Sequence, residues 1–257
     1  MWVAHFAPSL VLSRLAPKTP LSLLAFAGAL PDFLFFVFTI LGIETAKFSD
    51  KLDDPLYKSP TGGPGSHCFP YDCDNPYTHS FTGQATIGVL FAAATTILYR
   101  LPITSFITLF VATLTHYPLD LMVHRHDVAF TTSEPVHQRH GFPLFDYPII
   151  LFLVDVALFI GPLWFHLRTA NPGTDKTQRK TAVKAYGAAA LAAILVEANF
   201  AFMGAPTHQV RLIHAPIFAA EIVGISWAMG KMEGYTDVAG KKQLTPQEAK
   251  NAMKKVT

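Results

Sequence analysis

The feature that most constrains this chain is a series of long apolar segments separated by polar loops. Each segment is close to the length of about 20 apolar residues that a helix needs to cross the hydrocarbon core of a bilayer. Inside a bilayer every backbone N–H and C=O group must find a partner within the protein, which leaves helices or closed barrels. The sequence therefore predicts an all-α fold, a polytopic transmembrane helical bundle with six full spans. These spans cover approximately residues 21–43, 81–99, 103–123, 147–167, 182–202 and 212–230.

The same pattern divides the rest of the chain. Hydrophobic residues make up 51% of the chain and charged residues only 15%, well below the roughly 25% of an average soluble domain. Residues 2–16 are apolar but too few for a full span, so we expect a short N-terminal helical segment there. The expected organisation is a transmembrane helical domain over 1–230, polar loops at 44–78 and 124–146, and a polar tail over 231–257.

The basic residues indicate which side of the membrane each loop faces. Threading the spans alternately across a bilayer places fourteen of the 20 Lys and Arg residues on one side and six on the other. By the positive-inside rule the more basic side, which carries the C-terminal tail, should be cytoplasmic. No cluster of Lys and Arg is interleaved with aromatic residues, so nucleic acid is not an expected partner.

A cluster of ionisable residues closes the third apolar segment. His116, Asp120 and His124 are spaced four residues apart, and Asp127 follows three residues later. On a helix this spacing aligns the side chains on one face, each about 6 Å further along the axis. Neutral imidazole and ionised carboxylate are the usual ligands of a zinc-like ion. The alternative is a polar seam between packed helices that ends in water. We favour a metal site, because ionisable groups at such depth are costly and commonly functional.

Other segments carry residues of the same chemical type. Alternate threading brings His5, in the N-terminal segment, and His79, just before the second span, to the same end of the predicted bundle. Asp32 lies inside the first span beside Pro31, which should kink the helix. A shared cation would satisfy these buried groups at once, whereas pairwise hydrogen bonds are the alternative without a metal. The residues expected to converge around one or more divalent ions are His5, Asp32, His79, His116 and Asp120.

These motifs together resemble those of the integral-membrane metal-dependent hydrolases, a widespread and uncharacterised prokaryotic family. The shared features are His5, Leu30-Pro31-Asp32, Tyr77-Thr78-His79-Ser80, His116-x-x-x-Asp120 and Val123-His124-Arg125-x-Asp127. The order of His and Asp residues is also similar, more distantly, to the ligand order of zinc-dependent phospholipase C. The resemblance covers approximately residues 1–165 and implies a membrane-embedded hydrolase that uses a divalent metal ion, with Zn²⁺ as the expected one.

The reaction that follows from this resemblance is hydrolysis of a phosphoester or lipid-like substrate at the non-cytoplasmic face. The expected partners are then the lipid bilayer and a small amphiphilic substrate. His124, oriented by Asp127, would be a further ligand or a general acid/base, since imidazole titrates near neutral pH. Arg125 would hold a substrate phosphate through paired hydrogen bonds, or would simply extend its charge to water at the membrane interface.

Functions other than hydrolysis remain open. The carboxylates inside the predicted spans are Asp32, Asp155, Glu197 and Glu221. In an ion- or proton-coupled transporter these carboxylates would form the path of the ion or proton. The chain could equally be a metal-binding structural membrane protein. A non-hydrolytic membrane enzyme acting on a lipophilic metabolite would use the same groups as acids. A compact pocket open to one face favours an enzyme, whereas a file of carboxylates across the bilayer favours transport.

The two cysteines lie close together in one polar loop. Cys68 and Cys73 both fall in the segment 44–78, on the side assigned to an oxidising compartment. We expect a disulfide between them. Two free thiols, or two thiolate ligands to a metal, are the alternatives.

Overall fold

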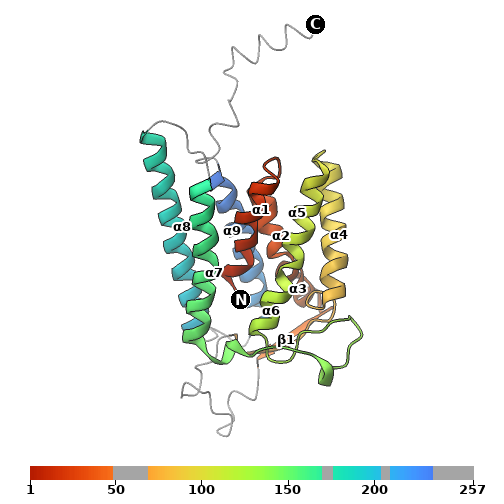
Figure 1. Cartoon of the computed structure of the whole chain (residues 1–257). Helices are drawn as coiled ribbons and strands as arrows, with labels where there is room; N and C mark the ends of the chain where they lie inside the picture. The colour runs from red at the N-terminus through yellow and green to blue at the C-terminus, as the bar shows by residue number, and fades with distance from the viewer. Residues whose placement is uncertain (49–68, 170–175, 204–208, 234–257) are drawn as a thin grey trace.

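The computed structural model describes residues 1–48, 69–169, 176–203 and 209–233. In these ranges the chain forms a bundle whose longer helices run side by side, and a short two-stranded sheet lies at one end (Figure 1). We call this end of the bundle the sheet end. The predicted all-α bundle is thus confirmed, with the small sheet as an addition.

The elements follow the predicted segments in order. The first part of the chain contains the 3₁₀-helix η1 (Val3–Phe6), the helices α1 (Ala7–Leu15), α2 (Leu21–Gly28) and α3 (Leu30–Leu41), and the strands β1 (Thr45–Phe48) and β2 (Tyr71–Asp74). The helices α4 (Phe81–Leu98), α5 (Ile103–Leu114) and α6 (His116–Val123) come next, and the 3₁₀-turns η3 (Val136–Gln138) and η4 (Leu144–Asp146) follow. The last part contains α7 (Pro148–Thr169), α8 (Lys176–Phe202), the π-helix η5 (Val210–His214) and α9 (Ala215–Glu233).

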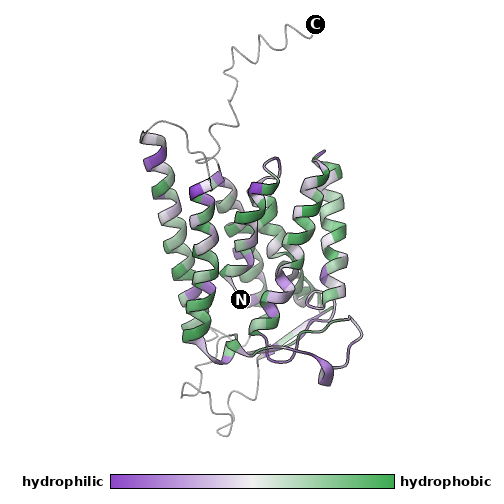
Figure 2. Ribbon diagram, viewed as in Figure 1, coloured by the Kyte–Doolittle hydropathy of each residue, from purple (hydrophilic) through white to green (hydrophobic). Residues whose placement is uncertain are grey.

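Within the described residues, five helical stretches are long and apolar enough to cross a membrane. They are Phe81–Leu98, Ile103–Val123, Pro148–Thr169, Arg179–Phe202 and Val210–Glu233, and the bent pair α2–α3 would be a sixth. Their limits agree with the predicted spans to within a few residues. Figure 2 shows the basis of this agreement: apolar residues dominate the helices, and polar residues gather at their ends and in the loops.

The first predicted span is broken, as the proline inside it predicted. Helices α2 and α3 meet at an angle of 61°. Pro31 lies in the first turn of α3, where a missing N–H costs nothing. Asp32 lies in the same turn, where the free N–H groups and the positive end of the helix dipole favour a carboxylate. The break therefore brings an acidic side chain into the interior of the bundle.

The N-terminal segment lies inside the bundle and not on its margin. Residues 1–7 are all buried, and η1 packs against α7, α1, α2 and α6. Figure 1 shows η1 and α1 in the middle of the bundle. Trp2 contributes to the largest buried apolar cluster, where its ring lies 5.1 Å from that of Phe218 on α9. A segment too short to span a membrane alone is stabilised here by the burial of its first seven residues.

The predicted polar loop 44–78 contains two strands that the sequence did not predict. β1 and β2 pair antiparallel, with Thr45 opposite Asp74 and Phe48 opposite Tyr71. Strands of four residues are too short for their alternation to be recognised in the sequence. Cys68, like the tail beyond residue 233, lies outside the described residues, so the disulfide with Cys73 stays a prediction.

Candidate metal centre

Six ionisable side chains from four separate segments meet toward the sheet end of the bundle. They are His5 of η1, Asp32 of α3, His79 just before α4, His116 and Asp120 of α6, and His124 at the C-terminal cap of α6. Only the side chain of Asp32, 13% exposed, is more than marginally accessible to solvent. The structure thus brings together all five residues predicted as ligands and His124, which the sequence analysis named as a further ligand or a general acid/base.

The carboxylate of Asp120 lies at the centre of this cluster. His116 Nε2 is 3.0 Å from Oδ2 of Asp120, and His5 Nε2 is 3.2 Å from Oδ1. The Nε2 atoms of His79 and His124 each lie 3.7 Å from an oxygen of the same carboxylate. One aspartate therefore faces four imidazole rings.

Asp32 faces three of the same rings from the opposite side. Its Oδ1 lies 3.2 Å from Nε2 of His79 and 3.5 Å from Nε2 of His116. Its Oδ2 lies 3.8 Å from Nε2 of His5. Four Nε2 atoms and two carboxylates thus surround a small common volume.

These separations are compatible with ligands around a cation, and the contact of 3.2 Å between His79 Nε2 and Oδ1 of Asp32 is also a hydrogen-bond distance. Bonds of about 2.0–2.1 Å at tetrahedral angles place neighbouring ligand atoms about 3.3 Å apart. Among the described residues, the buried Nε2 atoms of His5 and His116 and Oδ2 of Asp120 have no hydrogen-bond partner. Three overlapping sets of donor atoms lie within 4.8 Å of one another, namely His5–His116–Asp120, Asp32–His79–His116 and His79–Asp120–His124. These buried groups could hold a metal ion.

Three of the histidines, His116, His124 and His79, have a hydrogen-bond partner on Nδ1, which directs Nε2 toward the centre. Nδ1 of His116 lies 2.9 Å from the carbonyl of Gly28, and Nδ1 of His124 lies 2.9 Å from Oδ1 of Asp127. A carbonyl or carboxylate only accepts hydrogen bonds, so each Nδ1 carries a proton, and in the neutral ring each Nε2 keeps its lone pair. Metal-binding histidines are commonly oriented by such a second contact.

His79 is held by a buried relay that the sequence did not reveal. Its Nδ1 lies 2.8 Å from the Thr78 hydroxyl, which itself donates to Oε2 of Glu44 at 2.7 Å. The other carboxylate oxygen of Glu44 accepts the backbone N–H groups of Tyr77 and Thr78. Because the Thr78 proton goes to Glu44, its oxygen accepts the proton of His79. Glu44 lies between α3 and β1 in a segment without a recognisable motif, and no sequence signal identifies it.

His5 is positioned by packing. Its ring stacks on that of His116, with the ring centres 3.7 Å apart and the planes inclined by 14°. The backbone of η1 also comes unusually close to the end of α2. A Cβ atom on Gly28 would lie 2.2 Å from the carbonyl oxygen of His5, so only glycine permits this contact.

Asp155 fixes the segment that carries His5. Its carboxylate accepts the backbone N–H of Trp2 at 2.6 Å and that of Ala4 at 2.5 Å. These are donors at the start of η1, which has no cap from its own side chains. The sequence singled out Asp155 as a charge in a span but gave no indication of this partner. The aspartate is a positioning residue for the cluster.

The turn after α6 places Asp127 beside His124. His126 adopts a left-handed backbone conformation with φ of 57°, and Val128 pairs with His140 across the loop. A Cβ atom on Gly141 would lie 2.2 Å from the carbonyl oxygen of His124, so the loop packs tightly against the turn. Although burial opposes both charges, their mutual attraction and hydrogen bond raise the pKa of His124 and lower the pKa of Asp127.

Arg125 contacts the segments on either side of the turn after α6. Its Nε donates to Oδ1 of Asp146 at 2.5 Å, and its Nη1 donates to the carbonyl of Phe69 at 3.1 Å. The guanidinium carbon also lies 5.6 Å from the ring centre of Phe145. Arg125 thus links the turn after α6 to the segments before β2 and α7. Its role as a phosphate ligand stays a prediction.

A small cavity of about 20 Å³ adjoins the cluster. Its polar walls include Asp32, His79, Asp120 and His124, and aromatic side chains form most of the remainder. This volume accommodates about one water molecule. A catalytic zinc site needs such a position beside its protein ligands, whereas a purely structural site is closed by protein atoms.

Comparisons of this chain with models of protein families, with curated proteins and with solved structures find no match. The geometry of the cluster is therefore the basis for the functional argument.

Proposed function

We propose that this chain is a membrane-embedded, metal-dependent hydrolase that acts on a phosphoester of an amphiphilic substrate. The observation that carries this proposal is the buried cluster of four histidines and two aspartates beside a cavity of one water's size. Donors of this kind with an open position are typical of hydrolytic metal sites. The resemblance to the integral-membrane metal-dependent hydrolases supports the same reading.

Zinc is the ion that suits these donors best. The cluster offers imidazole nitrogens and carboxylate oxygens and no thiolate, a set that zinc shares with other borderline cations. Two buried carboxylates carry two negative charges, which a divalent ion would neutralise where water cannot. Bound at the cluster, the ion would lower the pKa of a water molecule and polarise a phosphoryl oxygen.

His124 and Asp127 are suited to proton transfer beside the cavity. Asp127 holds the proton on Nδ1 of His124, which leaves Nε2 directed at the cluster. A histidine held in this way can accept a proton from the attacking water and return it to the leaving group. The remaining histidines and Asp120 would hold the ion, and Asp32 at the margin of the cavity would complete the set.

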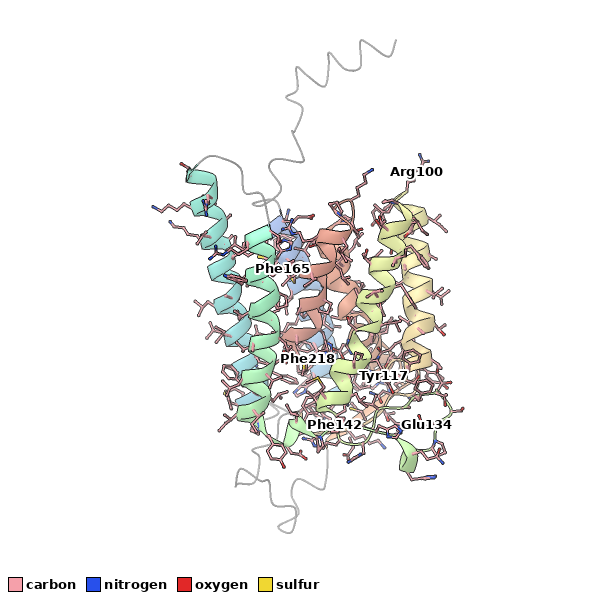
Figure 3. The ribbon with its side chains drawn as sticks, viewed as in Figure 1. Arg100, Tyr117, Glu134, Phe142, Phe165 and Phe218 are labelled. Atoms are coloured by element: carbon pink, nitrogen blue, oxygen red, sulfur yellow. The ribbon has the colours of Figure 1, made fainter. Side chains whose placement is uncertain are left out.

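The site is proposed to face the non-cytoplasmic side. The sheet end carries the smaller share of the basic residues in the predicted threading, and α9 ends at Glu233 at the opposite end of the bundle (Figure 1). Figure 3 shows the two ends marked by Glu134 at the sheet end and Arg100 at the other. The positive-inside rule then assigns the sheet end to the outside or to a lumen.

The positions of the carboxylates do not favour transport. Asp32 belongs to the cluster, and Asp155 is held by two backbone N–H groups. Glu197 and Glu221 lie in the halves of α8 and α9 nearer the sheet end. The acidic residues therefore gather toward one face and do not form a file across the bundle, which favours an enzyme.

Metal analysis and hydrolysis assays on the purified full-length protein test this proposal. We expect at least one zinc per chain and hydrolysis of a chromogenic phosphodiester that a chelator abolishes. The Asp120→Asn and His116→Ala variants should lose both the metal and the activity. His137→Ala is the matched control, because His137 is exposed and lies outside the cluster. Wild-type protein without metal contradicts the site, and metal-loaded protein without hydrolytic activity contradicts the reaction.

A further inference from the structure

Two larger cavities lie between α8 and α9, in line with the metal cluster. The one nearer the sheet end, the polar cavity, has a volume of about 320 Å³, and its lining includes Tyr71, Asn199, His214 and Glu221. The one farther from the sheet end, the apolar cavity, has a volume of about 350 Å³ and is lined mainly by alanines of α8 and by apolar residues of η1, α7 and α9. Both volumes are in the range of about 300–1,000 Å³ that is usual for ligand pockets.

The cavities form a series that leads away from the cluster. Val196 lines both the polar and the apolar cavity. The polar cavity in turn shares four aromatic residues with the small cavity at the cluster: Trp2, Phe69, Phe200 and Phe218. The rings of Trp2 and Phe200 stack at 5.8 Å, and Phe218, labelled in Figure 3, packs edge-on against Trp2. A wall of aromatic side chains thus separates the cluster from the polar cavity.

Polarity decreases along this series. The cluster is charged, the next cavity carries single hydroxyl, amide, imidazole and carboxyl groups, and the last is apolar except for Lys231 at its far end. A charged head, a polar linker and a hydrocarbon chain follow one another in the same order in an ester-linked lipid. From Val196 to Ala185 the apolar cavity follows α8 for eleven residues, or about 16 Å at 1.5 Å per residue.

We propose that the apolar cavity binds one acyl chain of the lipid whose phosphoester lies at the metal cluster. This inference rests on the proposed function and names its substrate class as an acyl lipid that enters laterally between α8 and α9. Three helices that line the cavity are long and apolar enough to cross a membrane, so hydrocarbon is the solvent at this depth. Water would find almost no polar partner there, and a chain fills such a space favourably. A lipid from the leaflet at the sheet end would extend its chain in this direction.

Photocrosslinking tests the position of the chain independently of catalysis. The probe is a monoacyl phosphatidic acid with a diazirine at the end of its chain, added to the full-length protein in phosphatidylcholine vesicles. We expect peptide mass spectrometry to locate the crosslinks on the cavity-lining residues of α8 and α9, and excess unlabelled probe to compete. Ala193→Trp, which fills the cavity, should reduce this labelling about tenfold, the effect of losing roughly two buried methylene groups.

Leu191→Trp is the matched control, because Leu191 is 58% exposed and does not line the cavity. It should leave the labelling unchanged, and both variants should keep their metal and hydrolyse a short-chain phosphodiester. The acyl-chain site would be overturned by crosslinks that spread over the exposed face of α8 and that Ala193→Trp does not reduce. If the protein retains its metal in that experiment, the proposed reaction is unaffected. Labelling of the cavity without hydrolysis of any phosphoester would overturn the proposed reaction and leave the chain site standing.

Discussion

Replacing Thr78 by Val tests whether the buried relay from Glu44 controls the metal cluster. Thr78 is completely buried, and valine has nearly the same shape without the hydroxyl. The substitution removes the hydrogen bonds that join Thr78 to His79 at 2.8 Å and to Glu44 at 2.7 Å. Glu44 keeps two backbone donors, from Tyr77 and Thr78, so its carboxylate stays in place. The change therefore acts on the orientation and tautomer of His79 and hardly on the packing around it.

The expected loss follows from the number of groups left without partners. Nδ1 of His79 and Oε2 of Glu44 both lose a buried partner, which costs about 1–3 kcal/mol for each group. Part of this cost falls on the metal-free protein as well. Losing the group that holds the opposite nitrogen of a metal-binding histidine commonly lowers metal affinity by about 10–100-fold. We expect Thr78→Val to lie in this range, which corresponds to about 1.4–2.8 kcal/mol.

Competition with a zinc chelator at fixed pH measures this affinity. Thr78→Ser keeps the hydroxyl and should bind zinc nearly as tightly as the wild type. Thr86→Val is the matched control, because it removes a threonine hydroxyl that bonds only within α4 and lies away from the cluster. A Thr78→Val protein with wild-type zinc affinity would refute the role assigned to Glu44 and Thr78.

Three further predictions address the anchor, the pH response and the orientation. Asp155→Ala leaves the N–H groups of Trp2 and Ala4 without their acceptor, so we expect a lower metal content and a lower thermal midpoint of unfolding. Asp155→Asn retains one carbonyl oxygen and should have a smaller effect. In metal-free protein Asp127→Asn should destabilise most between about pH 4 and 6.5. The raised pKa of His124 and the lowered pKa of Asp127 keep both groups charged in that window. The stability that the ion pair contributes is lost as the pH rises through the pKa of His124 or falls through the pKa of Asp127. Thermal unfolding measured across this pH range tests the prediction. Protease added from the cytoplasmic side of sealed vesicles should remove the C-terminal tail, and a protected tail contradicts the orientation.

The sequence by itself determined the helices and the main metal-binding candidates. Apolar segments of membrane-spanning length are a local property, because each helix satisfies its own backbone hydrogen bonds. The spacing of His116, Asp120 and His124 is local too, since one helix face aligns residues four apart. Pro31 predicted the break that brings Asp32 inward. These inferences needed no knowledge of which helices are neighbours.

Only the tertiary structure decided which distant groups complete and support the cluster. The Glu44–Thr78 contact joins residues 34 apart in the sequence, and Asp155 holds the backbone of Trp2 across 153 residues. Hydropathy does not distinguish a buried carboxylate that binds an ion from one that accepts backbone N–H groups, because both lie in apolar surroundings. Their roles depend on which donors the packing places beside them. For the same reason, the central place of the short N-terminal segment and the cavities between α8 and α9 arise only when the helices assemble.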